Sequence, residues 1–243
     1  MAGPVRAVWS GATDGDLRPS GRPPGRGAED LERWAAGVTA AGPAGRVRRV
    51  HWLDQVHGSR VVAVGPPSAG AVTAEVTAVD AGSGDALVSG APSTGLCVLT
   101  ADCAAVALGS DEGVFAAVHA GWRGLVGGVV GAAVDAMRAM GATRVVGALG
   151  PCVHASCYAF SPDDLDRVAG RLGDTVRGRT GDGRPALDIP AAVSVALSSA
   201  GADQTVGVDR CTACAGGYFS HRARGDRGRQ ALLVWSVAPP ATG

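Results

Sequence analysis

The chain has 243 residues, 46% of them hydrophobic and 18% charged, so it is long enough to bury a sizeable core. Its 22 Lys and Arg residues balance 22 Asp and Glu residues, which argues against a basic surface for nucleic acid. The apolar stretches Leu96–Leu108 and Val114–Val134 contain charged groups, and Met1–Arg6 has no apolar targeting segment. We therefore expect a cytoplasmic protein that binds neither nucleic acid nor a membrane.

The first third of the chain is irregular. The segment Thr13–Ala28 is rich in Gly, Pro, Asp and Arg, a composition typical of a surface loop. Apolar residues recur at helical spacing over Glu29–Ala41 and predict a short amphipathic helix. The alternating segment Arg46–Leu53 then predicts a strand that leads into Asp54–Gly58.

The middle of the chain alternates between strand-like and helix-like segments. We expect strands over Asp85–Val88, Val114–Val118 and Arg144–Leu149, an apolar run over Gly95–Leu108 that Thr100–Cys103 interrupts, and a long helix over Leu125–Met140. The strand over Val114–Val118 stops at His119–Gly124.

The last third continues the same alternation. We expect helices over Pro162–Leu172 and Ile189–Ala200, a loop over Arg177–Arg184, and strands over Gln204–Val208 and Gln230–Ser236. Strands and helices alternate along the whole chain, without an internal repeat or a long linker. This pattern predicts an α/β fold with residues 1–243 forming a single domain.

Three reactive side chains stand at predicted strand ends beside small residues. They are His57, Cys103 and His119. Two imidazoles and one thiolate are a suitable ligand set for catalytic zinc, which takes three protein ligands and keeps a fourth position open. Copper(I) also accepts these donors. The spacing matches no standard zinc motif, so the residues alone indicate this site only as one interpretation.

Each of these residues also has an ordinary structural interpretation. A His before Gly is often a hydrogen-bonded structural residue, and a Cys in an apolar run is often an inert thiol.

Asp102 is a candidate to orient the site or to act as a base. Arg123 is a candidate phosphate ligand or a surface cation.

Six cysteines without a secretion signal favour reduced thiols over disulfides. Cys211 and Cys214 form a Cys-x-x-Cys pair, which occurs in halves of zinc sites and in redox pairs. No second pair with this spacing is present, so buried thiols are the simpler interpretation.

Three segments resemble the signature blocks of the laccase-domain family. They are Gln55–Gly58, Thr100–Cys103 and His119–Gly124. Further blocks follow in the family's order: Gly150-Pro151, Cys157-Tyr158, Leu187-Asp188, Cys211-Thr212, Phe219–Arg222 and Gly228–Gln230. The resemblance extends from about Val50 to Trp235, while residues 1–45 match poorly. This family was long labelled multicopper polyphenol oxidase and is now associated with purine nucleoside phosphorylase activity.

The resemblance implies a four-layer α/β/β/α sandwich with mixed sheets and a zinc ion on His57, Cys103 and His119. It implies phosphorolysis of adenosine, inosine, guanosine and methylthioadenosine, with purine nucleosides and phosphate as substrates, and also adenosine deamination. We therefore expect Cys103, His119 and Asp102 to be catalytic, and Gln55, Arg123 and Arg222 to bind substrate.

Four positions depart from the family's blocks. Ala104 replaces a proline, Ala159 a glutamate, His221 a tyrosine and Arg227 a threonine. Two other functions therefore stay open from the sequence. One is a metal-free hydrolase or deamidase with Cys103 as nucleophile and His119 as base, and the other is a non-catalytic metal-binding protein. A copper oxidoreductase is disfavoured, because such enzymes need many histidines and the chain has five.

Overall fold

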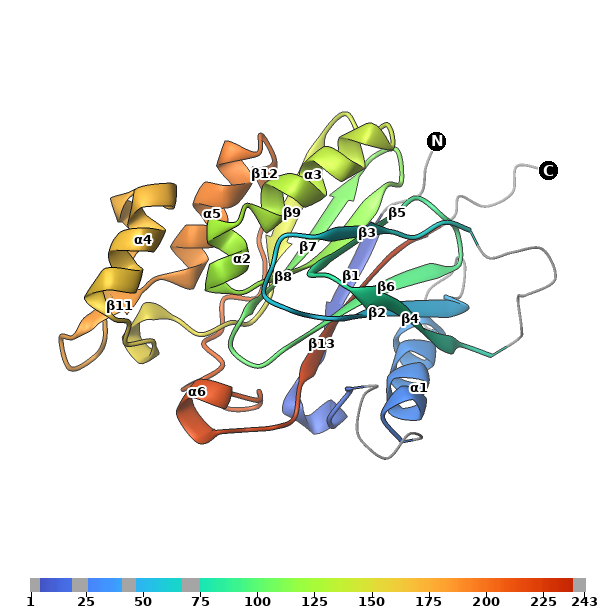
Figure 1. Ribbon diagram of the computed structural model, residues 1–243. Helices are drawn as coiled ribbons and strands as arrows, with labels where there is room; N and C mark the ends of the chain where they lie inside the picture. Colours follow the sequence, from blue (N-terminus) through green and yellow to red (C-terminus); the bar gives the residue numbers. More distant parts are fainter. Residues whose placement is uncertain (1–4, 19–25, 41–46, 67–74, 238–243) are drawn as a thin grey trace.

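Two β-sheets, with helices packed on them, make up the part of the protein that the structure describes (Figure 1). The computed structural model describes residues 5–18, 26–40, 47–66 and 75–237. Both sheets contain parallel and antiparallel pairs, so the protein is a mixed α/β protein, and the α/β class and the mixed sheets are confirmed.

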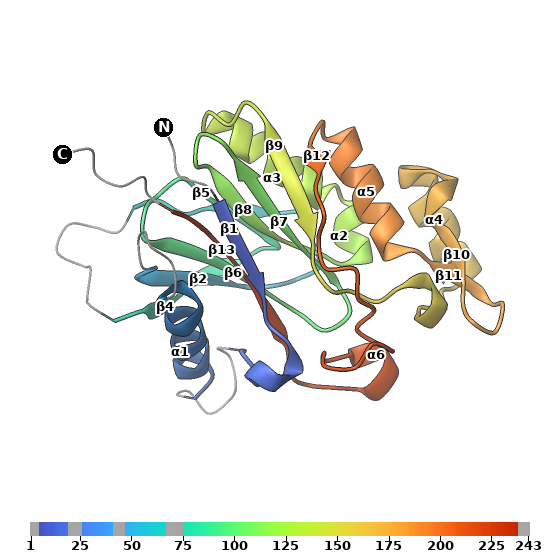
Figure 2. The same cartoon turned by 180° about the vertical axis from the view of Figure 1, so that it is seen from behind.

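The first sheet joins the first and last described strands of the chain. In the described residues it has five strands, in the order β1 (Val5–Trp9), β13 (Gln230–Ser236), β6 (Thr94–Thr100), β2 (Arg49–Asp54) and β4 (Thr77–Ser83). The strands β1 and β13 lie side by side in antiparallel register, which Figure 2 shows from behind.

The second sheet carries the middle of the chain. Over the same residues it has six strands, in the order β12 (Asp203–Gln204), β9 (Val145–Leu149), β7 (Ala104–Ser110), β8 (Phe115–Ala120), β5 (Ala86–Ser89) and β3 (Val61–Ala63). A separate antiparallel hairpin consists of β10 (Arg177–Arg179) and β11 (Pro185–Leu187).

The helices lie on both sides of this pair of sheets. They are α1 (Arg26–Ala40), α2 (Trp122–Val126), α3 (Val129–Ala139), α4 (Pro162–Leu172), α5 (Ile189–Ser199) and α6 (His221–Arg224), with short 3-10 turns η1 (Ala12–Asp14), η2 (Ala155–Cys157) and η3 (Asp174–Val176). In both views α1 lies beside the first sheet, on the side away from α2, α3 and α5 (Figures 1 and 2).

The buried apolar residues form three clusters. One joins the second sheet to α2–α5, and Val118, Val134 and Leu197 belong to it. A second contains Phe115 of β8 together with residues of β6 and β13, so it lies where the two sheets meet. The third joins Leu31 of α1 to the other side of the first sheet. Side chains alternate along β8 between the helices and the other sheet, because successive strand residues face opposite ways.

The bounds of two helices follow from local capping. Ser161 caps α4 by accepting the backbone N–H of Asp164, and Asp188 caps α5 by accepting that of Ala191. Each helix has a proline in its first turn, where no intrahelical N–H is needed. The predicted helix over Pro162–Leu172 and the predicted strand over Gln230–Ser236 are confirmed residue for residue.

Three expected elements are wrong in part. The single helix expected over Leu125–Met140 is two helices, because Gly128 has a left-handed φ of +81° between α2 and α3. The loop expected over Arg177–Arg184 contains β10, which pairs with β11. The strand expected over Gln204–Val208 is reduced to β12, and Val206 beyond it is 94% exposed.

Residues 19–25 of the loop expected over Thr13–Ala28 lie outside the described residues, while residues 12–14 form η1 and residues 26–28 begin α1. Among the described helices, none has the length and apolarity needed to cross a bilayer.

Candidate functional site

The register of the second sheet brings two of the predicted ligands together. In the pair β7–β8, Ala104 lies opposite Ala120 and Ala105 opposite His119. Cys103, which directly precedes β7, is therefore next to the end of β8 that carries His119. His119 shares the face of Phe115 and Ala117, so it points toward the first sheet.

The third predicted ligand comes from the first sheet. His57 follows β2 in a turn and has a positive φ of 59°, which non-glycine residues rarely adopt. The carboxylate of Asp85 holds this turn by accepting the backbone N–H groups of His57 at 2.9 Å and Gly58 at 2.6 Å. His57 Nε2 then lies 3.8 Å from Cys103 Sγ.

Asp85 also orients His119. Its Oδ1 lies 2.8 Å from His119 Nδ1, and both side chains are almost completely buried. An imidazole that donates Nδ1–H to a carboxylate keeps Nε2 free to bind a metal, as metal-bound histidines commonly do. Burial raises the pKa of Asp85, but the hydrogen bonds from His119 and the backbone outweigh this effect and lower it.

Cys103 and His119 stabilise each other's charged forms. Burial raises the pKa of the Cys103 thiol, but the nearby His119 and His57 outweigh burial and lower it to about 6. Burial lowers the pKa of His119, whereas the Cys103 thiolate and Asp85 raise it to about 9. The site therefore supplies a thiolate at neutral pH, which is the form that binds a metal ion.

The three side chains fit a zinc ion in donor chemistry and in space. The ligand atoms of His57, Cys103 and His119 all lie within 4.8 Å of one another. Gly121 has no side chain to fill the space beside these ligands. A Cβ at this position would lie 2.8 Å from His57 Cδ2 and 3.3 Å from Cys103 Sγ. Two imidazoles and one thiolate suit zinc, and copper(I) also accepts them.

The triad lies in a pocket of about 740 Å³. Besides the triad, its lining residues are Arg18, Trp52, Leu53, Asp54, Gln55, Leu99, Thr100, Ala101, Asp102, Trp122, Arg123, Tyr158, His221, Arg222 and Arg229. Two arginines of this wall stack on aromatic rings. The Arg123 guanidinium lies 4.4 Å from the Trp122 ring centre, and that of Arg222 lies 4.9 Å from the Tyr158 ring centre.

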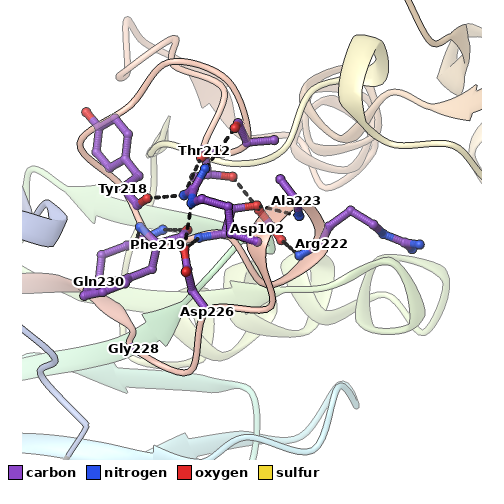
Figure 3. A network of polar contacts seen from close by, with 12 residues as sticks. Asp102, Thr212, Tyr218, Phe219, Arg222, Ala223, Asp226, Gly228 and Gln230 are labelled. Atoms are coloured by element: carbon purple, nitrogen blue, oxygen red, sulfur yellow. Dashed lines mark hydrogen bonds and ion pairs between the residues drawn. The ribbon is translucent and has the colours of Figure 1, made fainter. Parts of the chain in front are cut away.

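Asp102 is the centre of a buried polar network (Figure 3). Its Oδ1 accepts hydrogen bonds from the hydroxyl groups of Thr212 and Ser220, both at 2.7 Å, and its Oδ2 accepts the backbone N–H of Arg222 at 2.6 Å. Asp102 has a φ of 93°, so these bonds hold a backbone conformation that is rare for aspartate. The Arg222 side chain extends away from this network (Figure 3).

A second layer of hydrogen bonds fixes the segment that carries Arg222. The Ser220 hydroxyl caps α6 by accepting the backbone N–H of Ala223, and Asp226 accepts that of Ser220. Arg224 donates to the carbonyls of Thr212, Ala213 and Tyr218. The position of Arg222 therefore depends on Asp102, which lies 120 positions earlier in the chain.

Gln55 joins the two strands that border the pocket from the first sheet. Its Nε2 donates to the Leu99 carbonyl and its Oε1 accepts the Leu99 N–H, both at 2.8 Å. Because a primary amide has two N–H donors, one of them is not used by Leu99.

Sequence reasoning missed Asp85 and two pocket arginines. A carboxylate at the start of a buried strand was the available signal for Asp85, since a buried charge needs partners. Arg229 lies in the family block Gly228–Gln230, which was the available signal for it, whereas Arg18 follows a Gly- and Asp-rich segment that gave none. Asp16 holds both of them, through the Arg18 guanidinium at 2.6 Å and the Arg229 backbone N–H at 3.0 Å.

Comparison with known proteins identifies the family. Residues 32–237 match the family described as multi-copper polyphenol oxidoreductase laccase. The chain belongs to this family. Within the laccase family, a purine nucleoside phosphorylase of Streptomyces griseus is 39% identical over 189 residues, which cover 76% of this chain and 74% of that protein. One of Mycobacterium tuberculosis is 36% identical over 219 residues, which cover 88% and 81%.

Two solved structures share the fold of this chain. A Neisseria meningitidis protein superposes with a TM-score of 0.70 at 24% identity, covering 98% of this chain and 99% of that one. YlmD from Geobacillus stearothermophilus has the same TM-score and identity, covering 96% and 90%.

The positions that depart from the laccase-family blocks have distinct surroundings. Ala104 is buried at the start of β7, and Ala159 forms an isolated backbone bridge with Ala186. His221 begins α6 and lines the pocket. Arg227 is exposed, and its carbonyl accepts a hydrogen bond from Arg229.

Proposed function

We propose that this protein is a zinc-dependent purine nucleoside phosphorylase that acts on adenosine, inosine, guanosine and methylthioadenosine. The names of its relatives in Streptomyces griseus and Mycobacterium tuberculosis support this proposal. The observation that carries it is the convergence of the His57–Cys103–His119 triad, arginines and aromatic rings on one pocket.

Phosphorolysis has two electrostatic demands. A phosphate oxygen forms a bond to C1′ of the ribose while the bond from C1′ to the purine nitrogen breaks, and the departing base takes the electron pair and then a proton. The site must hold an anionic nucleophile and stabilise negative charge on the leaving group. Zinc on the triad would supply Lewis-acid chemistry to this reaction.

The arginines meet the first demand. Arg123 and Arg222 are the candidates to bind phosphate, because guanidinium groups match its oxygens in pairs. Each is restrained by stacking on an aromatic ring at 4.4 Å or 4.9 Å, which reduces the entropy lost when phosphate binds. Arg18 and Arg229 add positive charge to the same wall.

The remaining residues divide into binding and positioning groups. Trp122 and Tyr158 offer aromatic surface for a purine ring, and Gln55 keeps one N–H for a substrate acceptor. Asp102 acts as a positioning residue, because its carboxylate is engaged by Thr212, Ser220 and the Arg222 backbone. His57, Cys103 and His119 hold the metal.

The test is phosphate-dependent release of base from inosine by metal-depleted and zinc-restored protein. We expect release only with both phosphate and zinc, and its loss in Cys103→Ala but not in Cys97→Ala, a buried thiol outside the pocket. Undiminished release by metal-depleted protein would contradict the proposal. Ammonia release from adenosine in the same assay tests the adenosine deamination that the family resemblance implies.

We also propose that residues 1–243 form one domain with four layers in the order α/β/β/α. Three separate buried clusters support this arrangement, since they lie between α1 and the first sheet, between the sheets, and between the second sheet and α2–α5.

A further inference from the structure

A group of three thiols lies beside the pocket, separate from the His57–Cys103–His119 triad. Cys157 of η2, Cys211 and Cys214 come from two segments that are more than 50 residues apart, and their Sγ atoms all lie within 4.8 Å of one another. Cys211 is buried, Cys157 is half-buried and Cys214 is exposed. The group is therefore anchored in the protein on one side and open to solvent on the other.

Backbone contacts hold the Cys211 sulfur in place. A backbone bridge pairs Cys152 with Cys211, and the N–H of His154 donates to Cys211 Sγ at 3.4 Å. Residues 211–215 close a turn in which the Ala215 N–H donates to the Cys211 carbonyl at 2.9 Å. Burial raises the pKa of Cys211, but N–H donors from His154, Cys214 and Ala213 outweigh it and lower it.

We propose that Cys157, Cys211 and Cys214 form a second metal site, which binds a zinc ion through three sulfur atoms. Zinc binds three cysteines together with a fourth ligand in Cys3His sites, with each sulfur about 2.3 Å from the ion, so small rotations of the exposed Cys214 and half-buried Cys157 would close the group around it. A solvent molecule completes the tetrahedron on the open side. Soft sulfur donors select zinc over the hard cations magnesium and calcium.

The third thiol favours a metal over a redox pair. A disulfide between Cys211 and Cys214 would use two sulfurs and leave Cys157 without a partner. The hydrogen-bonded sulfur of Cys211 is already suited to a cation, and close thiolates repel one another unless a cation lies between them. The nearby Cys152 is completely buried and burial raises its pKa, so it stays a neutral thiol outside the group.

This ion would stabilise the wall of the pocket. Thr212, between two of the ligands, donates to Asp102 Oδ1 at 2.7 Å. Tyr158 follows Cys157 in the chain and carries the Arg222 guanidinium on its ring. The second zinc would therefore tie together the two segments that set the position of Arg222, without touching the reacting atoms.

The experiment measures zinc content after reduction, reloading and removal of loose metal with a weak chelator. We expect about two zinc ions per wild-type chain, about one in Cys103→Ala, about one in Cys214→Ala and none in the double variant, one for each ligand triad. Cys97→Ala is the matched control and should keep both ions. One zinc ion in the wild type that disappears in Cys103→Ala would overturn the proposal.

Cobalt substitution separates the two sites by their ligands. Sulfur-to-cobalt charge-transfer absorption scales with the number of bound thiolates, so the second site should contribute about three times the intensity of the first. Cys214→Ala should remove most of this absorption, whereas Cys103→Ala should remove the smaller part. Formation of a Cys211–Cys214 disulfide by mild oxidation of zinc-loaded protein, seen by peptide mass, would instead favour a redox pair and reject the metal site.

Folding of the variants is checked independently of metal content. Wild-type protein and Cys214→Ala should give the same far-UV circular dichroism after metal removal. Zinc should raise the melting temperature of Cys103→Ala, which keeps only the second site, because a ligand that binds only the folded state stabilises it. No zinc-dependent rise in this variant would count against the site.

Discussion

Oδ1 of Asp85 lies 2.8 Å from Nδ1 of His119, and the same carboxylate accepts the backbone N–H groups of His57 and Gly58. One buried side chain thus sets the orientation of one proposed metal ligand and the backbone of another.

Replacing Asp85 by asparagine should weaken zinc binding at the triad about 10–100-fold, the range typical for loss of a residue that orients a metal-bound histidine. Asparagine has one carbonyl oxygen where aspartate has two acceptors, so a backbone N–H of the His57 turn would lose its partner. Chelator competition measures the affinity. Asp135→Asn, on the exposed surface of α3, is the control and should bind zinc as the wild type does. Equal affinities of the two variants would contradict the orienting role.

Gly121→Ala should prevent zinc from binding while leaving the fold intact. The backbone of Gly121 has φ −71°, which alanine adopts freely, but the new Cβ would lie 2.8 Å from His57 Cδ2. The control is Gly131→Ala in α3, where a Cβ meets no atom within 4 Å. That change should stabilise the protein by about 0.5–1 kcal/mol, since glycine is unfavourable inside a helix. Metal content and thermal unfolding measure both effects, and normal zinc content in Gly121→Ala would refute the steric argument.

Cys103 in metal-free protein should react with iodoacetamide at neutral pH and lose reactivity as the pH falls through about 6. Its pKa is lowered from the ordinary thiol value, so the thiolate persists above pH 6 and is lost below it. Cys214 serves as the internal control, because its thiol is exposed but neighbouring sulfurs raise its pKa to about 11. Peptide mass spectrometry gives the rate at each site.

Zinc should protect Cys103 from this alkylation. Such protection distinguishes a metal ligand from the nucleophile of a metal-free Cys–His hydrolase. Rapid covalent trapping of Cys103 by an acyl substrate in zinc-loaded protein would support the hydrolase instead.

Asp102→Asn should raise the KM for phosphate more than it lowers kcat. The amide group would place a donor toward the hydroxyl of Thr212 or the backbone N–H of Arg222, and this loosens the segment that carries the Arg222 guanidinium. Asp111→Asn, in the exposed turn between β7 and β8, is the control. A loss confined to kcat, with its pH profile shifted, would point to Asp102 as a base.

Arg222→Ala and Arg123→Ala should each weaken phosphate binding by about 10–100-fold, because a charged hydrogen bond contributes about 1.5–3 kcal/mol. The exposed Arg138 of α3 offers a matched arginine outside the pocket, and Arg138→Ala should leave phosphate binding unchanged. Phosphate saturation curves at fixed inosine concentration measure the effect. An unchanged KM for phosphate in both pocket variants would remove the arginines from the proposed phosphate site.

The sequence was sufficient for the features that depend on local pattern. The pattern of strand-like and helix-like segments predicted α4 and β13 with their bounds, and the ordered family blocks indicated His57, Cys103 and His119 as a group. The sequence was insufficient where a single backbone angle decides where a helix ends. Gly128 divides one expected helix into two, and no periodic pattern reports its φ of +81°.

Only the tertiary structure decided which residues support the triad. Asp85 and His119 are 34 positions apart, and they meet because β5 and β8 pair in a register that no local signal specifies. The tertiary structure also brings Asp102 to Ser220 and Cys157 to Cys211, which are far apart in the sequence. Chemistry that resides in one side chain can be recognised from the sequence, whereas chemistry that depends on a distance between two strands exists only once the sheets are formed.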